Sequence, residues 1–155
     1  MGEPIVTKFD QWMTRAIAEA KLTADSVDVP VAALVFDQND NLVSIGRNER
    51  ELTGDPTAHA EVVAIRAAAA ATGSWRLDEM TLVVTLEPCT MCAGAILQAR
   101  IPRVVFGAWD EKAGASGSVN DLLRDRRLPH KVEVVAGIQE AECAALLTDF
   151  FEARR

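Results

Sequence analysis

Five short apolar runs, separated by segments of helical pattern, constrain the fold of this chain more than any other feature. Their sequences are VAALVFD (31–37), LVSIGRN (42–48), TLVVTL (81–86), RVVFGA (103–108) and VEVVAGI (132–138). Short runs that are rich in β-branched side chains and bounded by turn residues are typical of buried strands. The polar residues between the first two runs predict a β-hairpin.

Apolar side chains that recur every three or four residues predict helices around these runs. The predicted helices cover residues 8–24, 57–73, 89–100, 121–131 and 139–154. Asp55 or Thr57 can cap the second helix, Gly73 ends it, and Pro102 closes the third. This order predicts a single α/β domain over residues 1–155. Its three α/β/α layers contain a five-stranded mixed sheet that is largely parallel after the hairpin.

The charge of the chain argues against some functions. The formal net charge is −7 and the isoelectric point is about 4.8. Such a chain is not expected to bind nucleic acid or anionic membranes over a broad surface, because phosphate attracts clustered Lys and Arg. Any contact with nucleic acid is therefore expected to be local. The one dense basic stretch, residues 124–131, either contacts RNA or is a solvated surface.

The N-terminal sequence MGEPIVTKFDQW has an early acidic residue and lacks the apolar run of a signal peptide. No later stretch approaches the roughly 20 apolar residues of a membrane span. We therefore expect a cytoplasmic protein without membrane contact. In a reducing compartment its three cysteines are expected to be thiols or metal ligands rather than disulfides.

Cys89 and Cys92 fall in the first turn of the third predicted helix, where the helix dipole favours thiolates. The pair could be a redox site, half of a structural zinc site or part of a catalytic centre. A structural zinc site needs four protein ligands. Cys143, however, lies in register with apolar residues of the last helix and is expected to be a buried hydrophobe. This leaves His59, Cys89 and Cys92, the three-ligand set of a catalytic zinc site with one open position.

Glu61 follows His59 by two residues near the N-terminus of the second predicted helix. A catalytic zinc site needs a base to move the proton of a water molecule, and Glu61 can reach that water without being a ligand. By itself, a carboxylate in this position would be interpreted as a partner of the helix dipole. His130 has no zinc role in this scheme.

The sequences HAE (59–61) and PCTMC (88–92) resemble the signature of the zinc-dependent nucleoside and nucleobase deaminases. Within that superfamily, several longer stretches look like the bacterial tRNA-specific adenosine deaminases, over roughly residues 9–154. These stretches are DPTAHAE, GSWRL, TLEPCTMCAGAI, RIPRVVFGAWDEKAGASGS and ECAALLTDFF.

The resemblance implies a cytidine-deaminase-like fold and one Zn²⁺ per subunit, held by His59, Cys89 and Cys92. It also implies that Glu61 is the catalytic proton shuttle. The implied reaction is the hydrolytic deamination of the wobble adenosine of a tRNA anticodon to inosine. The adenosine has to be splayed out of its loop before it can enter the site.

The resemblance further implies two substrate contacts. Asn48 matches an asparagine that hydrogen-bonds the flipped base, although alone it could be a turn residue. Asp110 matches an acidic residue near the RNA backbone, although alone it would be interpreted as a solvated loop carboxylate. The implied partners are a tRNA anticodon stem-loop, usually that of the arginine tRNA with an ACG anticodon, and a second copy of the chain in a homodimer.

Two alternatives remain open at this stage. The chain could deaminate a free base or nucleoside, such as guanine or cytosine, for which an acidic surface is natural. The sequences FGAWDEKAGASGS and CAGAI favour the tRNA enzyme over this alternative. The chain could instead be a non-catalytic, zinc-stabilised RNA-binding subunit, which the presence of Glu61 disfavours.

Overall fold

The structure, a computed structural model, describes residues 5–155, and its centre is a five-stranded sheet. The strand order is β2-β1-β3-β4-β5. β1 pairs with β2 and β3 in antiparallel fashion, whereas β3–β4 and β4–β5 are parallel pairs. The strands are β1 (Ala32–Phe36), β2 (Leu42–Arg47), β3 (Thr81–Leu86), β4 (Arg103–Ala108) and β5 (Glu133–Val135). The predicted hairpin and mixed sheet are therefore confirmed.

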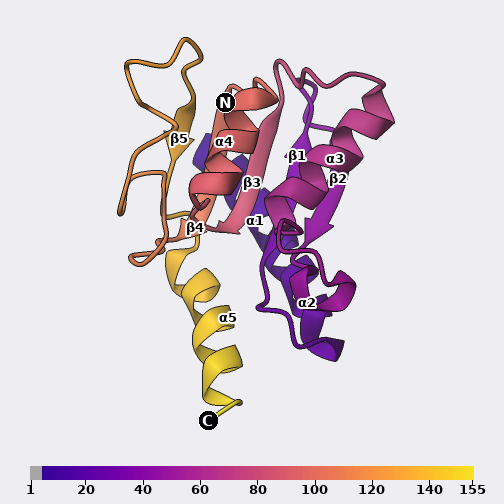
Figure 1. Cartoon of the computed structure of the whole chain (residues 1–155), viewed down its shortest axis with the longest axis vertical. Helices are drawn as coiled ribbons and strands as arrows, with labels where there is room; N and C mark the ends of the chain where they lie inside the picture. Colours follow the sequence, from indigo (N-terminus) through magenta and orange to yellow (C-terminus); the bar gives the residue numbers. More distant parts are fainter. Residues whose placement is uncertain (1–4) are drawn as a thin grey trace.

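Helices cover both faces of this sheet (Figure 1). They are α1 (Ile5–Lys21), the 3₁₀ helix η1 (Leu22–Asp25), α2 (Arg50–Thr53), α3 (Ala60–Thr72), α4 (Thr90–Gln98) and α5 (Glu140–Glu152). α3 and α4 lie on one face, and α1 and α5 pack against the other, where α1 contacts β1 and β3 and α5 contacts β4. The predicted three-layer α/β/α arrangement is confirmed.

The alternation of side chains along the strands divides the core into two apolar clusters. In β1, Ala33 and Val35 belong to the cluster beneath α3 and α4, whereas Leu34 and Phe36 belong to the cluster beneath α1. This is the two-residue period of a strand that is covered on both faces. In the second cluster, Trp12 of α1 stacks on Phe36 with a ring-centroid distance of 4.0 Å.

The parallel pair β3–β4 determines where the site lies. Leu86 and Ala108, the last residues of these strands, are paired in register, and the N–H of Glu87 donates to the carbonyl oxygen of Ala108 at 2.8 Å. Ligand sites of α/β sheets lie outside the carboxyl ends of parallel strands. The loops that follow β3 and β4 carry PCTMC and Asp110, so the sheet brings these predicted site segments to one edge.

The prediction of a short basic helix over residues 121–131 is wrong, because these residues form turns. Asp125 accepts a hydrogen bond from the backbone N–H of Arg127 at 2.9 Å. The Nζ of Lys131 donates to three backbone carbonyl oxygens of the same segment. Pro129 also disfavours helical geometry at Leu128. Side-chain bonds to the backbone thus replace the helical ones.

Other boundaries differ by a few residues. α1 ends at Lys21 and continues as η1, where a single helix to residue 24 is predicted. α3 begins at Ala60 rather than at residue 57, and β5 is shorter than the apolar run 132–138. α2 is not predicted. The first four residues, which belong to the stretch tested for a signal peptide, lie outside the described residues.

Among the helices within residues 5–155, none is both long enough and apolar enough to cross a membrane.

Candidate metal and active site

Two helix N-termini meet at the carboxyl edge of β3. His59 is the N-cap residue of α3, and Cys89 is the N-cap residue of α4. Glu61 and Cys92 lie in the first turns of the same two helices. The expectation that all four residues lie near helix N-termini is met. The positive ends of both helix dipoles therefore act on one place, where they favour anionic groups.

The turn before α3 orients His59. The Oδ1 of Asp55 accepts hydrogen bonds from the backbone N–H and the hydroxyl of Thr57, both at 2.8 Å. The N–H of Ala58 donates to the carbonyl oxygen of Asp55. Asp55 thus closes the turn before the helix rather than capping the helix itself. His59 follows in an extended conformation, and the first helical hydrogen bond runs from Val63 to its carbonyl oxygen.

The donor atoms of three predicted ligands form one cluster. The Nδ1 of His59 lies 3.6 Å from the Sγ of Cys89 and 3.5 Å from the Sγ of Cys92. The three donor atoms all lie within 4.8 Å of one another. Zinc bonds of about 2.0–2.1 Å to nitrogen and 2.3 Å to sulfur at a tetrahedral angle correspond to a separation of about 3.6 Å. The spacing and the donor types therefore fit Zn²⁺.

The other candidate ligands lie elsewhere. Cys143 is 1% exposed and packs in the apolar cluster beneath α1, and burial raises the pKa of its thiol to about 12. The ring nitrogen Nε2 of His130 lies 2.9 Å from the carbonyl oxygen of Ile101. Within the described residues, the metal-binding group contains neither residue. The expectation that Cys143 is a buried hydrophobe is confirmed.

The groups of this cluster and the neighbouring Glu61 have pKa values that depart from their ordinary values. Side-chain hydrogen bonding with Cys92 and with His59 lowers the pKa of the Cys89 thiol to about 4. The hydrogen bond with Cys89 raises the pKa of Cys92 and also that of His59. Burial raises the pKa of Glu61 to about 7. A carboxyl group with that pKa can both accept and donate a proton near neutral pH.

These groups open into a cavity of about 230 Å³. That volume is below the roughly 300–1,000 Å³ of sites for drug-sized ligands, so the cavity suits a group as small as one base. Besides His59, Glu61 and Cys89, the two predicted substrate residues Asn48 and Asp110 line it. Its other lining residues are Val29, Val31, Arg50, Ala60, Leu86, Glu87 and Ala113.

Asn48 follows β2 and is held by the backbone on both sides of its amide. Its Nδ2 donates to the carbonyl oxygen of Val29 at 3.1 Å, and its Oδ1 accepts from the N–H of Arg50 at 3.3 Å. The amide therefore has a fixed orientation at the cavity wall, with one further N–H that these bonds do not use.

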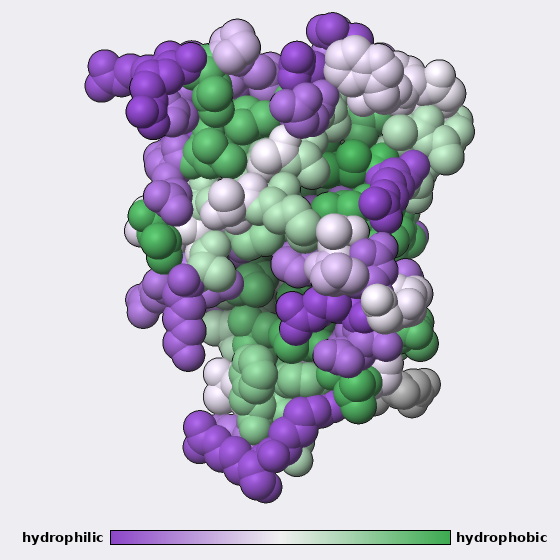
Figure 2. Space-filling model, in the orientation of Figure 1, coloured by the Kyte–Doolittle hydropathy of each residue, from purple (hydrophilic) through white to green (hydrophobic). Residues whose placement is uncertain are grey.

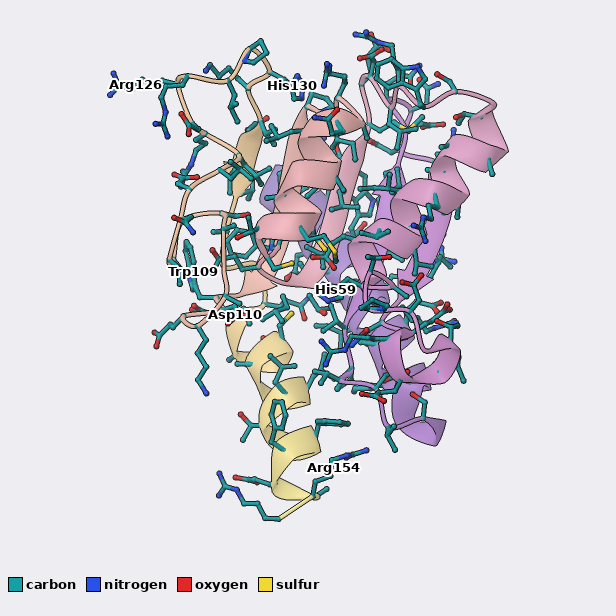
Figure 3. The ribbon with its side chains drawn as sticks, viewed as in Figure 1. His59, Trp109, Asp110, Arg126, His130 and Arg154 are labelled. Atoms are coloured by element: carbon teal, nitrogen blue, oxygen red, sulfur yellow. The ribbon has the colours of Figure 1, made fainter. Side chains whose placement is uncertain are left out.

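Asp110 follows β4 at the other side of the cavity. Its Oδ1 accepts hydrogen bonds from the backbone N–H groups of Lys112 and Ala113, both at 3.1 Å. The side chain thus closes a turn in the loop as well as lining the cavity. Figure 3 shows that Asp110 and His59 lie in the middle of the molecule.

The basic stretch 124–131 lies away from this cavity. Figure 3 places Arg126 and His130 at one end of the molecule, and Figure 2 shows hydrophilic side chains gathered at that corner. Arg124 pairs with Asp121 at 2.8 Å, and Arg127 pairs with Asp125 at 2.7 Å. Part of the positive charge is therefore matched by Asp121 and Asp125, which favours the interpretation as a solvated surface.

One functional candidate was missed by the sequence reasoning. Glu87 lies between β3 and Pro88, lines the cavity and is 2% exposed. A charged residue between a fully buried strand and the PCTMC motif is the signal that could have identified it, because buried carboxylates need specific partners.

Comparison with known proteins agrees with the geometry. A family model described as MafB19-like deaminase matches residues 7–155. The chain is 43% identical over 150 residues to the tRNA-specific adenosine deaminase of Bacillus subtilis (strain 168), an alignment that covers 97% of this chain and 92% of that protein.

Two solved structures are also similar. One comes from studies of A-to-I editing by tRNA:A34 deaminases at the wobble position of transfer RNA. It superposes with a TM-score of 0.84 at 38% identity and covers 88% of this chain and 99% of its own. The guanine deaminase of Bacillus subtilis superposes with a TM-score of 0.63 at 34% identity, covering 72% of this chain and 71% of its own.

Proposed function

The chain belongs to the MafB19-like deaminases and, among them, to the family of tRNA-specific adenosine deaminases, and from this premise we propose that it converts the wobble adenosine of a tRNA anticodon to inosine. The observation that carries the proposal is that the donor cluster of His59, Cys89 and Cys92 adjoins one base-sized cavity, which Glu61 also lines. The reaction is adenosine plus water to inosine plus ammonia.

One Zn²⁺ per chain is assigned to the Nδ1 of His59 and the thiolates of Cys89 and Cys92. The spacing of these donors and their nitrogen and sulfur chemistry support the assignment. When bound, zinc acts as a Lewis acid that lowers the pKa of water toward neutrality.

Glu61 moves the protons of the reaction. Its burial and its pKa of about 7 suit a group that takes a proton from the attacking water and gives it to N1 of the purine ring. The same carboxyl group then assists proton transfer to the leaving amino group, which departs as ammonia. A carboxyl group with a pKa near neutrality can change between its two protonation states in successive transfers.

Asn48 orients the base. Since its amide is fixed by Val29 and Arg50, its remaining N–H can bond an acceptor on the purine ring without first being ordered. The cavity has room for a base that has left its stack and excludes a base pair. This selects an unpaired nucleotide in a loop, as single-stranded RNA recognition generally does.

The substrate is the anticodon stem-loop of a tRNA, in the first instance the arginine tRNA with an ACG anticodon.

The enzyme acts in the cytoplasm as a homodimer, and Asp110 lies next to the RNA backbone. Among the described residues that line the cavity, Arg50 is the one Lys or Arg, which is consistent with a local RNA contact rather than a broad one. Light scattering of the purified protein tests the dimer.

The test is inosine formation in an ACG anticodon stem-loop, measured beside free adenosine, cytidine and guanine. We expect conversion of the stem-loop only. The same strand paired with a full complement is the control, and it should not react because its adenosine cannot leave the duplex without breaking a base pair. Conversion of guanine or another free compound without conversion of the stem-loop would replace this proposal with the free-base alternative.

A further inference from the structure

The carboxylate of Glu87 is almost fully buried and is surrounded by hydrogen-bond donors from one loop. Its Oε1 accepts from the N–H of Asp110 at 2.9 Å and from the hydroxyl of Ser118. Its Oε2 accepts from the N–H groups of Ser116 and Ser118, both at 3.0 Å. Every one of these donors belongs to residues 110–118.

The backbone of residues 110–118 packs closely around the carboxylate of Glu87. A Cβ atom on Gly114 would overlap both oxygens of Glu87, so the backbone approaches as closely as it does only because residue 114 has no side chain. The N–H of Ala115 donates to the carbonyl oxygen of Pro88 at 2.8 Å, and Gly114 forms a β-bridge with Cys89. The loop therefore folds around the residues that join β3 to α4.

Glu87 makes no ion pair with a residue of the described part of the chain, 5–155. A buried carboxylate is stabilised either by an opposite charge or by several N–H and O–H donors. Here the donors do this alone, and they come from a loop without regular secondary structure. The conformation of the loop therefore depends on the carboxylate of Glu87, and the burial of this carboxylate depends on the loop.

This loop forms one wall of the cavity. Asp110 and Ala113 line it on the side of β4, whereas Asn48 lines it on the side of β2. We propose that Glu87 is a positioning residue that fixes the loop 109–118 and thereby sets how well the enzyme binds its nucleic-acid substrate. The inference rests on the proposed function and assigns a role to a residue outside the metal ligands and the proton shuttle.

Glu87→Gln tests the proposal, because the amide keeps the size of the side chain but turns one acceptor into a donor that faces backbone N–H groups. We expect KM for the stem-loop to rise about tenfold or more, with kcat changed by less than about threefold. The zinc content should stay at one ion per chain. A defect confined to KM separates positioning from a general loss of folded enzyme, which would lower the active fraction and leave KM unchanged.

Trp109 reports on the loop directly. It precedes Asp110 and is 40% exposed, whereas Trp12 is 8% exposed. In a Trp75→Phe background, Trp109 is therefore the one strongly accessible tryptophan, and acrylamide quenching measures its exposure. We expect Glu87→Gln to raise the quenching constant, because the freed loop no longer holds the Trp109 ring against Phe106, whose centroid lies at 5.0 Å.

A milder variant and a steric variant test the same loop without changing Glu87. Ser118→Ala removes only the hydroxyl donor, and Gly114→Ala pushes the loop away while leaving Glu87 intact. Both should change KM and quenching in the same direction, Ser118→Ala by about two- to fivefold in KM. Asp37→Asn is the matched control, since Asp37 also accepts two backbone N–H bonds, but in the β1–β2 turn. It should change neither quantity.

Unchanged KM and quenching in all three loop variants would overturn the proposal. Loss of zinc from Glu87→Gln with an unchanged quenching constant would also overturn it, because Glu87 would then support Cys89 rather than the loop. If the unmodified protein fails to deaminate the stem-loop, the proposed function is wrong. The quenching series then still decides whether Glu87 fixes the loop.

Discussion

The Nδ1 of His59 lies 3.5 Å from the Sγ of Cys92, although 33 positions separate the two residues. The position of each side chain depends on more than its own helix. His59 is placed by the turn before α3, and Cys92 is placed by β3, Pro88 and the first turn of α4. The metal site is therefore a product of the whole sheet edge, and each prediction below tests one part of that edge.

Replacing Glu61 should separate metal binding from catalysis. Glu61→Ala and Glu61→Gln are expected to retain zinc, because the described donor cluster consists of His59, Cys89 and Cys92. The rate of inosine formation should fall by about 10²–10⁴-fold, the usual contribution of a general acid–base group. Elemental analysis and single-turnover kinetics measure the two quantities. Zinc loss in both variants would show that Glu61 supports the metal site.

Cysteine replacements should distinguish ligand from core residue. Cys92→Ser is expected to lose zinc and activity together, whereas Cys143→Ser should keep both, since Cys143 lies in the apolar cluster beneath α1. Metal content and activity are measured on the same preparations. Loss of zinc from the Cys143 variant would contradict the ligand assignment.

The buried thiol of Cys143 should make stability fall at high pH. The ordinary pKa of a thiol is 9.0, and burial raises the folded-state pKa of Cys143 to about 12. Below pH 9 both states keep the proton. Between those values only the unfolded chain releases it, so the free energy of unfolding falls by up to about 1.4 kcal/mol per pH unit.

Urea titrations of the unmodified chain and of Cys143→Ala between pH 8 and pH 11 test this dependence. The variant should lack the Cys143 contribution, so the difference in stability between the two proteins should shrink as the pH rises. Parallel pH profiles would show that the Cys143 thiol titrates alike in the folded and unfolded states.

Gly46 should tolerate no side chain. A Cβ atom there would overlap the carbonyl oxygen of Ala60 in the first turn of α3. Gly46→Ala is therefore expected to destabilise the fold by about 1–3 kcal/mol or more and to weaken zinc binding by moving His59.

Gly94→Ala is the matched control. Nothing lies within 4 Å of its added Cβ, and a helical alanine should stabilise by about 0.5–1 kcal/mol. Thermal unfolding and zinc titration compare the pair, and equal effects would refute the argument.

Local patterns in the sequence were sufficient for the elements around the site. The β-branched runs predicted β3 and β4, and the helical patterns with their flanking turn residues predicted His59 and Cys89 near helix N-termini, where the structure has them. The resemblance to tRNA-specific adenosine deaminases is confirmed by the relative that is 43% identical. The roles of Asn48 and Asp110 remain predictions.

Hydrogen bonds between side chains and the backbone explain what the sequence did not predict. Residues 121–131 have a composition that permits a helix, but Asp125 and Lys131 bond to the backbone of the segment instead. The position of Glu87 between a strand and PCTMC indicates a buried carboxylate, but its donors lie 23 to 31 positions away, and no local pattern predicts them. α2 begins where Asp28, another distant carboxylate, accepts hydrogen bonds from the backbone N–H groups of Glu51 and Leu52, and it ends at Gly54 in the left-handed conformation.

His59 and Cys89 occupy N-cap positions, and neither makes a side-chain capping hydrogen bond. Ser, Thr, Asp or Asn at such positions usually stabilises a helix by about 1 kcal/mol. At these two places the substitutions that a protein engineer would choose to strengthen the fold are the ones that would remove the metal ligands. Attempts to make this enzyme more heat-resistant should therefore leave both helix starts unchanged and use positions away from them, such as Gly94.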